Sequence, residues 1–206
     1  MSYEYLDLCS SPLVGKPYDL LINCLDEPDM NVFFIYGPPA SGKYTVSKAL
    51  SEITGYKLFH NHLTYDTAYA LFGDDVYSMA FKQCCEKLRL AAISEAAAHR
   101  VDMIFTLVYD HASDQDFVQQ LKAVVEEVGG VINFVCLKPS IEIIEQRVTE
   151  ESRKAFKKVA SLEELSVFKN HYDIYSSIPN AESLVIDNSY LKPEYVAKKI
   201  IKSIGI

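Results

Sequence analysis

The chain has 206 residues, of which 49% are hydrophobic and 23% are charged, and it contains 8 Gly and 8 Pro. This composition is typical of one compact domain with an elaboration at one end, and it excludes collagen, a coiled coil and a wholly disordered chain. The formal net charge of −8 repels a phosphate backbone over most of the surface, so we expect no nucleic-acid partner, and an anionic ligand must meet a local site.

Apolar runs and cysteines bear on where the protein resides. The run at residues 131–137 is far shorter than the roughly 20 residues that cross a bilayer, and the N-terminus shows no secretory signal. The five cysteines are an odd number without a C-x-x-C pair, which argues against a disulfide framework and a zinc site. We expect a cytoplasmic protein without membrane contact, either a monomer or a homodimer.

Five β-rich runs alternate with stretches of helical periodicity. The predicted strands are 32–36, 57–61, 103–108, 131–137 and 184–187. The predicted helices are 46–53 with a C-cap at Gly55, 77–99, 118–128, 141–148, one opened by a capping box at 161–164, and one begun by Pro193. Such strands predict a five-stranded parallel sheet with helices on both faces, a three-layer α/β/α domain. The domain spans residues 31–206, and residues 1–30 form an N-terminal extension without an assigned role.

A glycine-rich loop follows the first predicted strand and precedes a helix. It reads Gly37-Pro38-Pro39-Ala40-Ser41-Gly42-Lys43-Tyr44-Thr45. This sequence resembles the Walker A pattern G-x-x-x-x-G-K-[ST] in the strand-to-helix context that the pattern requires. Its glycines let consecutive N–H groups and the positive end of the helix face a phosphate, while Lys43 reaches the outer phosphates. These residues predict a nucleotide-binding loop.

Tyr44 departs from this pattern, which has Ser or Thr at that position to coordinate Mg²⁺. A phenol oxygen cannot occupy the place of a short hydroxyl, and Thr45 points about 100° away around the helix. Two interpretations stay open. Either water and other side chains hold the metal, with Thr45 and, through water, Asp110 as candidates, or catalysis is weakened.

The span from about residue 31 to 206 resembles the small P-loop kinases, which include nucleoside monophosphate, shikimate and gluconate kinases and chloramphenicol phosphotransferase. After the loop, Val135-Cys136-Leu137-Lys138-Pro139-Ser140 leads into a helix with Arg147, and Arg153, Lys154, Lys157 and Lys158 follow. The resemblance implies that Arg147 contacts the nucleotide, that a basic lid at about 150–160 closes over it, and that Arg153 stabilises the transferring group. It also places Asn188, after the fifth strand, near the adenine. The cations could instead form a solvated face paired with Glu150 and Glu151.

The acceptor of such a kinase lies opposite the glycine-rich loop at residues 37–45, which we call the phosphate loop, and beyond the second strand. His60, Asn61, His62 and Asp66 follow that strand. Neutral His62 could serve as the base that orients the attacking hydroxyl, or Asp66 could, one helical turn later. We expect His60 and Asn61 to contact the substrate, and only one of the two histidines to enter the site.

Three more residues are candidates for the acceptor side. Tyr109 and Asp110 follow the third strand and are expected to line the acceptor pocket. Arg89 precedes that strand, near the position where monophosphate kinases hold the acceptor phosphate.

Together these features predict an ATP-dependent phosphotransferase that acts on a small hydroxyl- or phosphate-bearing acceptor, with ATP and Mg²⁺ as cofactors. The alternative is a nucleotide-binding regulatory module with weakened catalysis, which Tyr44 favours. The identity of the acceptor and the choice between ATP and another triphosphate stay open.

Overall fold

Five parallel strands make the central layer of the structure, a computed structural model that describes residues 30–151, 153 and 158–205. The strands are β1 (Asn31–Tyr36), β2 (Lys57–His60), β3 (Met103–Leu107), β4 (Val131–Leu137) and β5 (Ser183–Ile186), in the spatial order β2-β3-β1-β4-β5. In the middle of the sheet, Phe34 pairs with Phe105 on one side and Phe134 on the other. The predicted five-stranded parallel sheet is therefore confirmed.

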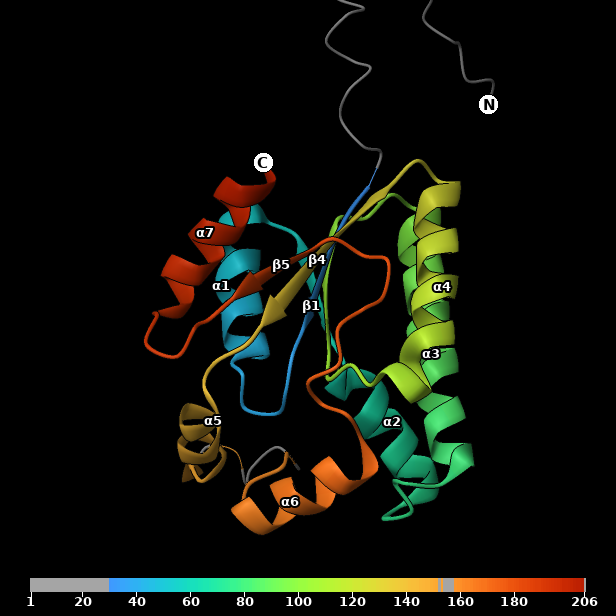
Figure 1. The fold of residues 1–206 in the computed structure, drawn as a ribbon. Coiled ribbons are helices and arrows are strands. Elements are labelled where there is room, and N and C mark those ends of the chain that lie inside the picture. The colour runs from blue at the N-terminus through green and yellow to red at the C-terminus, as the bar shows by residue number, and fades with distance from the viewer. Residues whose placement is uncertain (1–29, 152, 154–157, 206) are drawn as a thin grey trace, which may run out of the picture.

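Seven helices surround the sheet in the described part of the chain. They are α1 (Lys43–Thr54), α2 (His62–Phe72), α3 (Met79–Ala98), α4 (His111–Glu127), α5 (Ile141–Val148), α6 (Leu162–His171) and α7 (Pro193–Ile204). Helices α1 and α7 cover one face and α3 and α4 cover the other, while α2, α5 and α6 gather at the carboxyl ends of the strands (Figure 1). The predicted three-layer α/β/α architecture is thus confirmed, and the additional helices stand where ligands of parallel sheets bind.

Helix α2 was not predicted by periodicity. Its sequence, HLTYDTAYALF, spreads apolar and polar residues around the whole circumference, and only Thr64 and Ala68 are buried. A helix that buries so narrow a strip produces no regular apolar stripe in the sequence.

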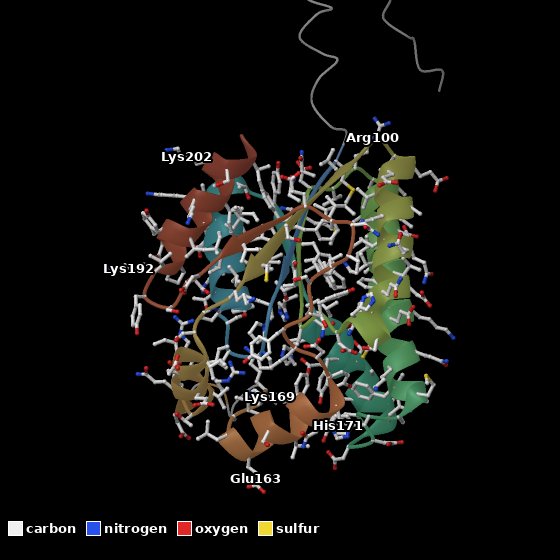
Figure 2. The ribbon with its side chains drawn as sticks, in the orientation of Figure 1. Arg100, Glu163, Lys169, His171, Lys192 and Lys202 are labelled. Carbon is white, nitrogen blue, oxygen red and sulfur yellow. The ribbon has the colours of Figure 1, made fainter. Side chains whose placement is uncertain are left out.

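The apolar sequence of β1 follows from burial on both of its faces. Phe34 lies in the core beneath α3 and α4, where its ring centroid is 5.3 Å from that of Phe105 and 5.4 Å from that of Phe134. Phe33 and Ile35 lie in the opposite core, beneath α1 and α7. A strand buried on both faces needs no polar alternation, which explains the continuous apolar run. Charged side chains such as Arg100, Lys192 and Lys202 project from the periphery (Figure 2).

The predicted N-terminal extension falls almost wholly, and the predicted lid partly, outside the described residues. Of the N-terminal extension only Met30 is described; it is buried, and its carbonyl accepts a hydrogen bond of 2.8 Å from the Val131 amide. Of the predicted lid at 150–160, the structure describes residues 150, 151, 153 and 158–160. No helix in the described ranges is both long and apolar enough to cross a bilayer.

Candidate active site

The turn between β1 and α1 has a backbone with positive φ at three residues, two of which are glycines. Gly37 adopts a φ of 145°, Ala40 a φ of 61° and Gly42 a φ of 86°. A Cβ atom on Gly37 would lie 2.2 Å from the carbonyl oxygen of Leu137, so no other residue fits there. Positive φ values curl the turn next to the N-terminus of α1, and the Ser41 amide closes it by donating to the Pro38 carbonyl at 3.2 Å. The turn therefore has the shape of an anion cradle.

The side chain of Lys43 lies inside this turn. Its Nζ donates hydrogen bonds to the carbonyl oxygens of Gly37 (2.8 Å) and Pro38 (2.7 Å) and lies 3.3 Å from Ser41 Oγ. Burial, together with the positive charges of Arg153 and Lys158, lowers the pKa of Lys43 to about 7. An anion in the cradle would favour the charged ammonium and offer it oxygen acceptors.

The turn after β5 is hydrogen-bonded to the glycine-rich loop. The buried Asn188 donates from Nδ2 to the carbonyl oxygen of Ser41, at 2.8 Å. Arg147, from α5, donates to the carbonyl oxygens of Asn188 (3.1 Å) and Ser189 (2.8 Å). These bonds place Arg147 next to Gly42, since a Cβ atom on that glycine would lie 4.0 Å from its Nη1. The structure thus brings Arg147 and Asn188 next to the phosphate loop.

A cavity of about 1640 Å³ opens over the loop and extends to α2, α3 and α6. On the loop side it is lined by Lys43, Tyr44, Thr45, Arg147, Arg153 and Asn188. On the opposite side it is lined by five other predicted residues, His60, Asn61, His62, Asp66 and Arg89. A volume of this size exceeds that of a typical single-ligand pocket and can hold two ligands side by side.

Both histidines enter the cavity, which corrects the expectation that only one would. His60 ends β2 and His62 begins α2, and their ring centroids are 6.5 Å apart. Residues two apart along a strand share a face, and the turn into the helix keeps His62 on that side. Burial, with the charge of Lys158, lowers the pKa of His62 to about 4 and also lowers that of His60. Both rings are therefore neutral near pH 7, and in the described residues the buried His62 Nδ1 has no hydrogen-bond partner.

Tyr44 and the described lid residues also meet at this cavity. The Tyr44 ring contacts the His60 ring edge to face, and Lys158 Nζ lies 5.3 Å from the Tyr44 ring centroid. Arg153 donates from Nε to the carbonyl oxygen of Val159, at 2.8 Å. Lys154 and Lys157, which complete the predicted basic cluster, lie outside the described residues.

Tyr109 and Asp110 do not line the large cavity, contrary to the expectation for the acceptor pocket. Tyr109 is buried against Tyr36, with ring centroids 6.0 Å apart. Asp110 caps α4 by accepting from the backbone and hydroxyl of Ser113, and it accepts from the Asp173 amide at 2.9 Å. Its oxygens are committed to these structural bonds, so the structure gives no support to its role toward a metal.

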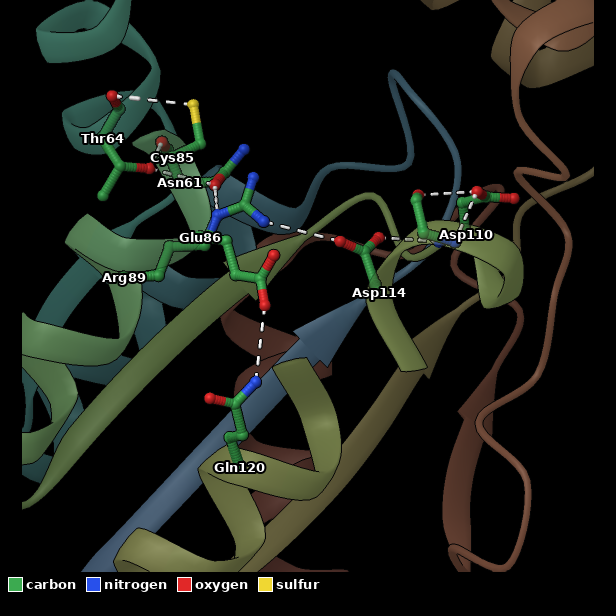
Figure 3. A network of polar contacts seen from close by, with 9 residues as sticks. Asn61, Thr64, Cys85, Glu86, Arg89, Asp110, Asp114 and Gln120 are labelled. Atoms are coloured by element: carbon green, nitrogen blue, oxygen red, sulfur yellow. Dashed lines mark hydrogen bonds and ion pairs between the residues drawn. The ribbon is translucent and has the colours of Figure 1, made fainter. Parts of the chain in front are cut away.

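Asp114, one turn into α4, reaches the cavity in their place (Figure 3). Its Oδ1 lies 3.5 Å from Nη1 of Arg89, and its Oδ2 accepts from the Asp110 amide at 3.0 Å. Burial raises the pKa of Asp114, and the charge of Arg89 opposes that rise. Sequence reasoning missed Asp114 because an acid in the first turn of a helix is a common cap-associated feature. The signal that could have found Asp114 is its position four residues after Asp110. Residues with this spacing lie on the same side of a helix.

The donors available to a metal are sparse. Within the described residues no group of three His, Cys, Asp or Glu side chains stands at metal-binding spacing. Thr45 is exposed and lines the cavity, so its hydroxyl is the nearest match to the prediction. This arrangement fits a cation carried mainly by a ligand and by water, as Mg²⁺ commonly is.

No protein-family model and no curated protein matches this sequence. Solved structures do resemble it. A sugar kinase from a Janibacter species superposes with a TM-score of 0.62 and 15% identity, covering 86% of this chain and 95% of its own. A gluconokinase from Sinorhizobium meliloti gives a TM-score of 0.57 at 16% identity, with 87% and 94% covered. The chain has the fold of the small P-loop kinases.

A third structure with this P-loop kinase fold is a shikimate kinase from Acinetobacter baumannii in complex with shikimate, with a TM-score of 0.54 and 16% identity. The match covers 85% of this chain and 93% of that one. The matches therefore span nearly the whole length of each kinase.

Proposed function

We propose that the protein is an ATP-dependent phosphotransferase that acts on a small hydroxyl- or phosphate-bearing acceptor. The observation that carries the proposal is the cradle from Gly37 to Lys43, which opens onto one cavity shared with His62 and Arg153. The cradle fits a phosphate because its backbone excludes any Cβ at Gly37 and because the Lys43 ammonium is aimed into it. The likeness to kinases supports the same reading.

On the nucleotide side, the loop amides and Lys43 hold the phosphates and keep the terminal one next to the acceptor half of the cavity. Arg147 is positioned by two backbone carbonyls, so its guanidinium is already oriented at the loop before a nucleotide arrives. Arg153 and Lys158 add positive charge where the transferring group gains negative charge. Preorganised cations of this kind supply most of the catalysis in phosphoryl transfer.

On the acceptor side, the hydroxyl oxygen attacks the terminal phosphorus, the bond from that phosphorus to the bridging oxygen breaks, and ADP leaves. The hydroxyl proton passes to His62, whose ring lines the cavity and is neutral near pH 7. A pKa of about 4 makes His62 a weak base, which suffices when the proton leaves late in a loose transition state. Asp66, which is exposed at the same wall, is the second candidate.

Mg²⁺ supplies charge neutralisation between the terminal phosphates when it is bound with the nucleotide. Thr45 is the protein hydroxyl best placed to approach it, because Tyr44 turns its ring toward His60. We propose that phosphate oxygens and water provide the other ligands.

Tyr44 is also the observation that favours a second candidate, a nucleotide-binding regulatory module with weakened catalysis. Under that reading, Tyr44 stands where the pattern has a metal-binding Ser or Thr, and its ring instead contacts Lys158. Such a module would bind nucleotide as tightly as the kinase but would form no ADP with any acceptor.

The experiment compares nucleotide binding and turnover in Lys43→Met and Lys48→Met. Both substitutions remove a lysine from α1, but Lys48 is exposed and lies outside the cavity. Thermal shifts with ATP and GTP, with and without Mg²⁺, report binding, and ADP release with candidate acceptors reports transfer. Loss of both signals in Lys43→Met alone supports the kinase. Equal behaviour of the two variants contradicts the kinase. Nucleotide binding by the wild-type chain without ADP release favours the regulatory module.

A further inference from the structure

The cavity has two halves: the phosphate half, lined by the glycine-rich loop, Arg147 and Arg153, and the acceptor half, lined by α2, α3 and α6. The two halves differ in net charge and in the number of aromatic side chains. We propose that the acceptor half selects an acceptor that is uncharged or cationic and carries a flat ring beside its hydroxyl, and that it rejects carboxylates and phosphates. This inference rests on the proposed function, and it narrows the acceptor class that the sequence left open. Three independent features of the walls carry it.

The first feature is that Arg89 is already engaged and neutralised (Figure 3). Its Nε donates to Asn61 Oδ1 at 2.7 Å, its Nη1 pairs with Asp114 at 3.5 Å, and its guanidinium carbon lies 5.7 Å from the ring centroid of Phe117. The side chains of Arg89 and Asp114 are only 12% and 13% exposed. An acceptor carboxylate or phosphate that approached Nη1 of Arg89 would meet Asp114, a like charge that the Asp110 amide holds in place.

The second feature is the surplus of acidic side chains on this side. Asp66 of α2 and Glu86 of α3 line the cavity with Asp114, and so does Asp74, which accepts from the Tyr69 hydroxyl. Among the described residues, Glu86 accepts a long hydrogen bond, 3.4 Å, from Gln120. The cations on these walls are Arg89 and Lys82, and Lys82 Nζ lies 5.0 Å from the ring centroid of Tyr172. A field of this sign attracts cations and repels anions.

The phosphate half has the opposite balance. Lys43, Arg147, Arg153 and Lys158 line it, with Glu150 as the acid among them. The cavity is therefore polarised from end to end, and an anionic acceptor would be drawn to the nucleotide end rather than to the wall opposite. Specificity that rests on such repulsion needs no dedicated contact to the rejected ligand.

The third feature is the aromatic surface that α2, α3 and α6 present to the cavity. The ring centroids of Tyr65 and Phe81 are 5.1 Å apart, and those of Phe168 and Tyr172 are 4.7 Å apart. The ring centroid of Tyr77, a side chain that is 42% exposed, lies 6.3 Å from that of Tyr172. Rings of this kind bind flat apolar faces and cations, and they give little to an open-chain anion.

Three probes with the same ring and the same hydroxymethyl group test the inference. They are benzyl alcohol, 4-(aminomethyl)benzyl alcohol and 4-(hydroxymethyl)benzoate, which are neutral, cationic and anionic. Their affinities for the full chain are measured by NMR titration in the presence of a non-hydrolysable ATP analogue. We expect the neutral and cationic probes to bind at least about tenfold more tightly than the anionic one.

Two substitutions test the walls directly. Asp114→Asn releases Arg89 and should improve the affinity of the anionic probe by about tenfold, while weakening the cationic probe. Glu86→Gln leaves Arg89 paired and should weaken the cationic probe alone. Glu127→Gln, at the far end of α4 and outside the cavity, should change neither affinity. If Asp114→Asn does not fold, the Glu86→Gln comparison with Glu127→Gln decides the charge argument.

A preference of the wild-type chain for the anionic probe, or failure of all three probes to bind at millimolar concentration, would overturn the inference. The binding measurement needs no turnover, so it separates the inference from the proposed function. Binding in the expected order without ADP formation would contradict the kinase alone. ADP formation with a carboxylate or phosphate acceptor would contradict the inference alone.

Discussion

The rings of Tyr44 and His60 meet edge to face, with centroids 5.2 Å apart and planes at 87°. Tyr44 belongs to the first turn of α1, and His60 is the last residue of β2. Lys158, from the segment that follows α5, approaches the same tyrosine ring at 5.3 Å. Tyr44 therefore links α1, the end of β2 and the segment that follows α5, and its ring makes these contacts.

Tyr44→Phe should keep kcat/KM within about twofold of wild type, because the ring contacts persist, whereas Tyr44→Ser should lower it by up to about tenfold, as expected for loss of an aromatic pair. Steady-state ADP release over a range of Mg²⁺ concentrations measures both effects. A gain of activity or of Mg²⁺ affinity in Tyr44→Ser would show instead that the tyrosine disables a kinase, and would favour the regulatory module.

The low pKa of Lys43 predicts that nucleotide affinity falls with rising pH. Its ammonium has a pKa of about 7 in the free protein, mainly because it is buried. Phosphate favours the protonated form, so binding above pH 7 must be accompanied by proton uptake, and affinity should fall by up to about tenfold per pH unit. Calorimetric titration of ADP between pH 7.5 and 9 measures the slope. In Lys43→Arg the cation stays protonated, so a slope equal to that of wild type would exclude Lys43 as its source.

Removal of the Asn188 side chain should loosen the phosphate loop. Asn188→Ala leaves the Ser41 carbonyl without the bond that its Nδ2 donates, and an unsatisfied buried group costs about 1–3 kcal/mol of unfolding free energy. We expect weaker ATP binding as well, since the loop loses its attachment to the β5 turn. Urea denaturation and ATP titration measure the two effects. Tyr190→Ala, two residues on and 87% exposed, serves as the control. Undiminished ATP affinity in Asn188→Ala would show that the loop keeps its shape alone.

The protein should lose stability through His62 as the pH falls. The pKa of His62 is about 4 in the folded chain and about 6.5 in an unfolded one. The unfolded state therefore takes up a proton between these values while the folded state does not. The stability associated with neutral His62 is complete above pH 6.5 and is lost progressively toward pH 4, by on the order of 2 kcal/mol.

Urea denaturation at pH 7 and pH 4.5 checks this dependence on pH. In His62→Gln, the free energy of unfolding should differ less between the two pH values than in wild type. His99 is exposed at the end of α3, so His99→Gln should show the same difference as wild type. Equal differences in wild type and His62→Gln would mean that other groups account for the acid sensitivity.

The sequence by itself determined the sheet and the phosphate loop, because both are local in origin. A strand buried on both faces must be apolar along its length, as β1 is. A backbone with positive φ at Gly37 and Gly42 requires glycine at those positions, and the strand-to-helix context places the loop at the carboxyl edge of the sheet. The same holds for the N-caps Ser140 and Ser161 and for Pro193 at the first position of α7, where helices begin as the sequence predicted.

The tertiary structure decided the acceptor side. Arg89 and Asp114 are 25 residues apart and meet only because α3 and α4 lie side by side on the same face. The inward positions of both histidines depend on where β2 ends and α2 begins, and α2 has too narrow a buried strip to mark itself in the sequence. Tyr109 and Asp110 stand at the expected strand end but turn into the core and the α4 cap. Which side chains face a shared cavity depends on how separate elements pack, and no local pattern encodes that relation.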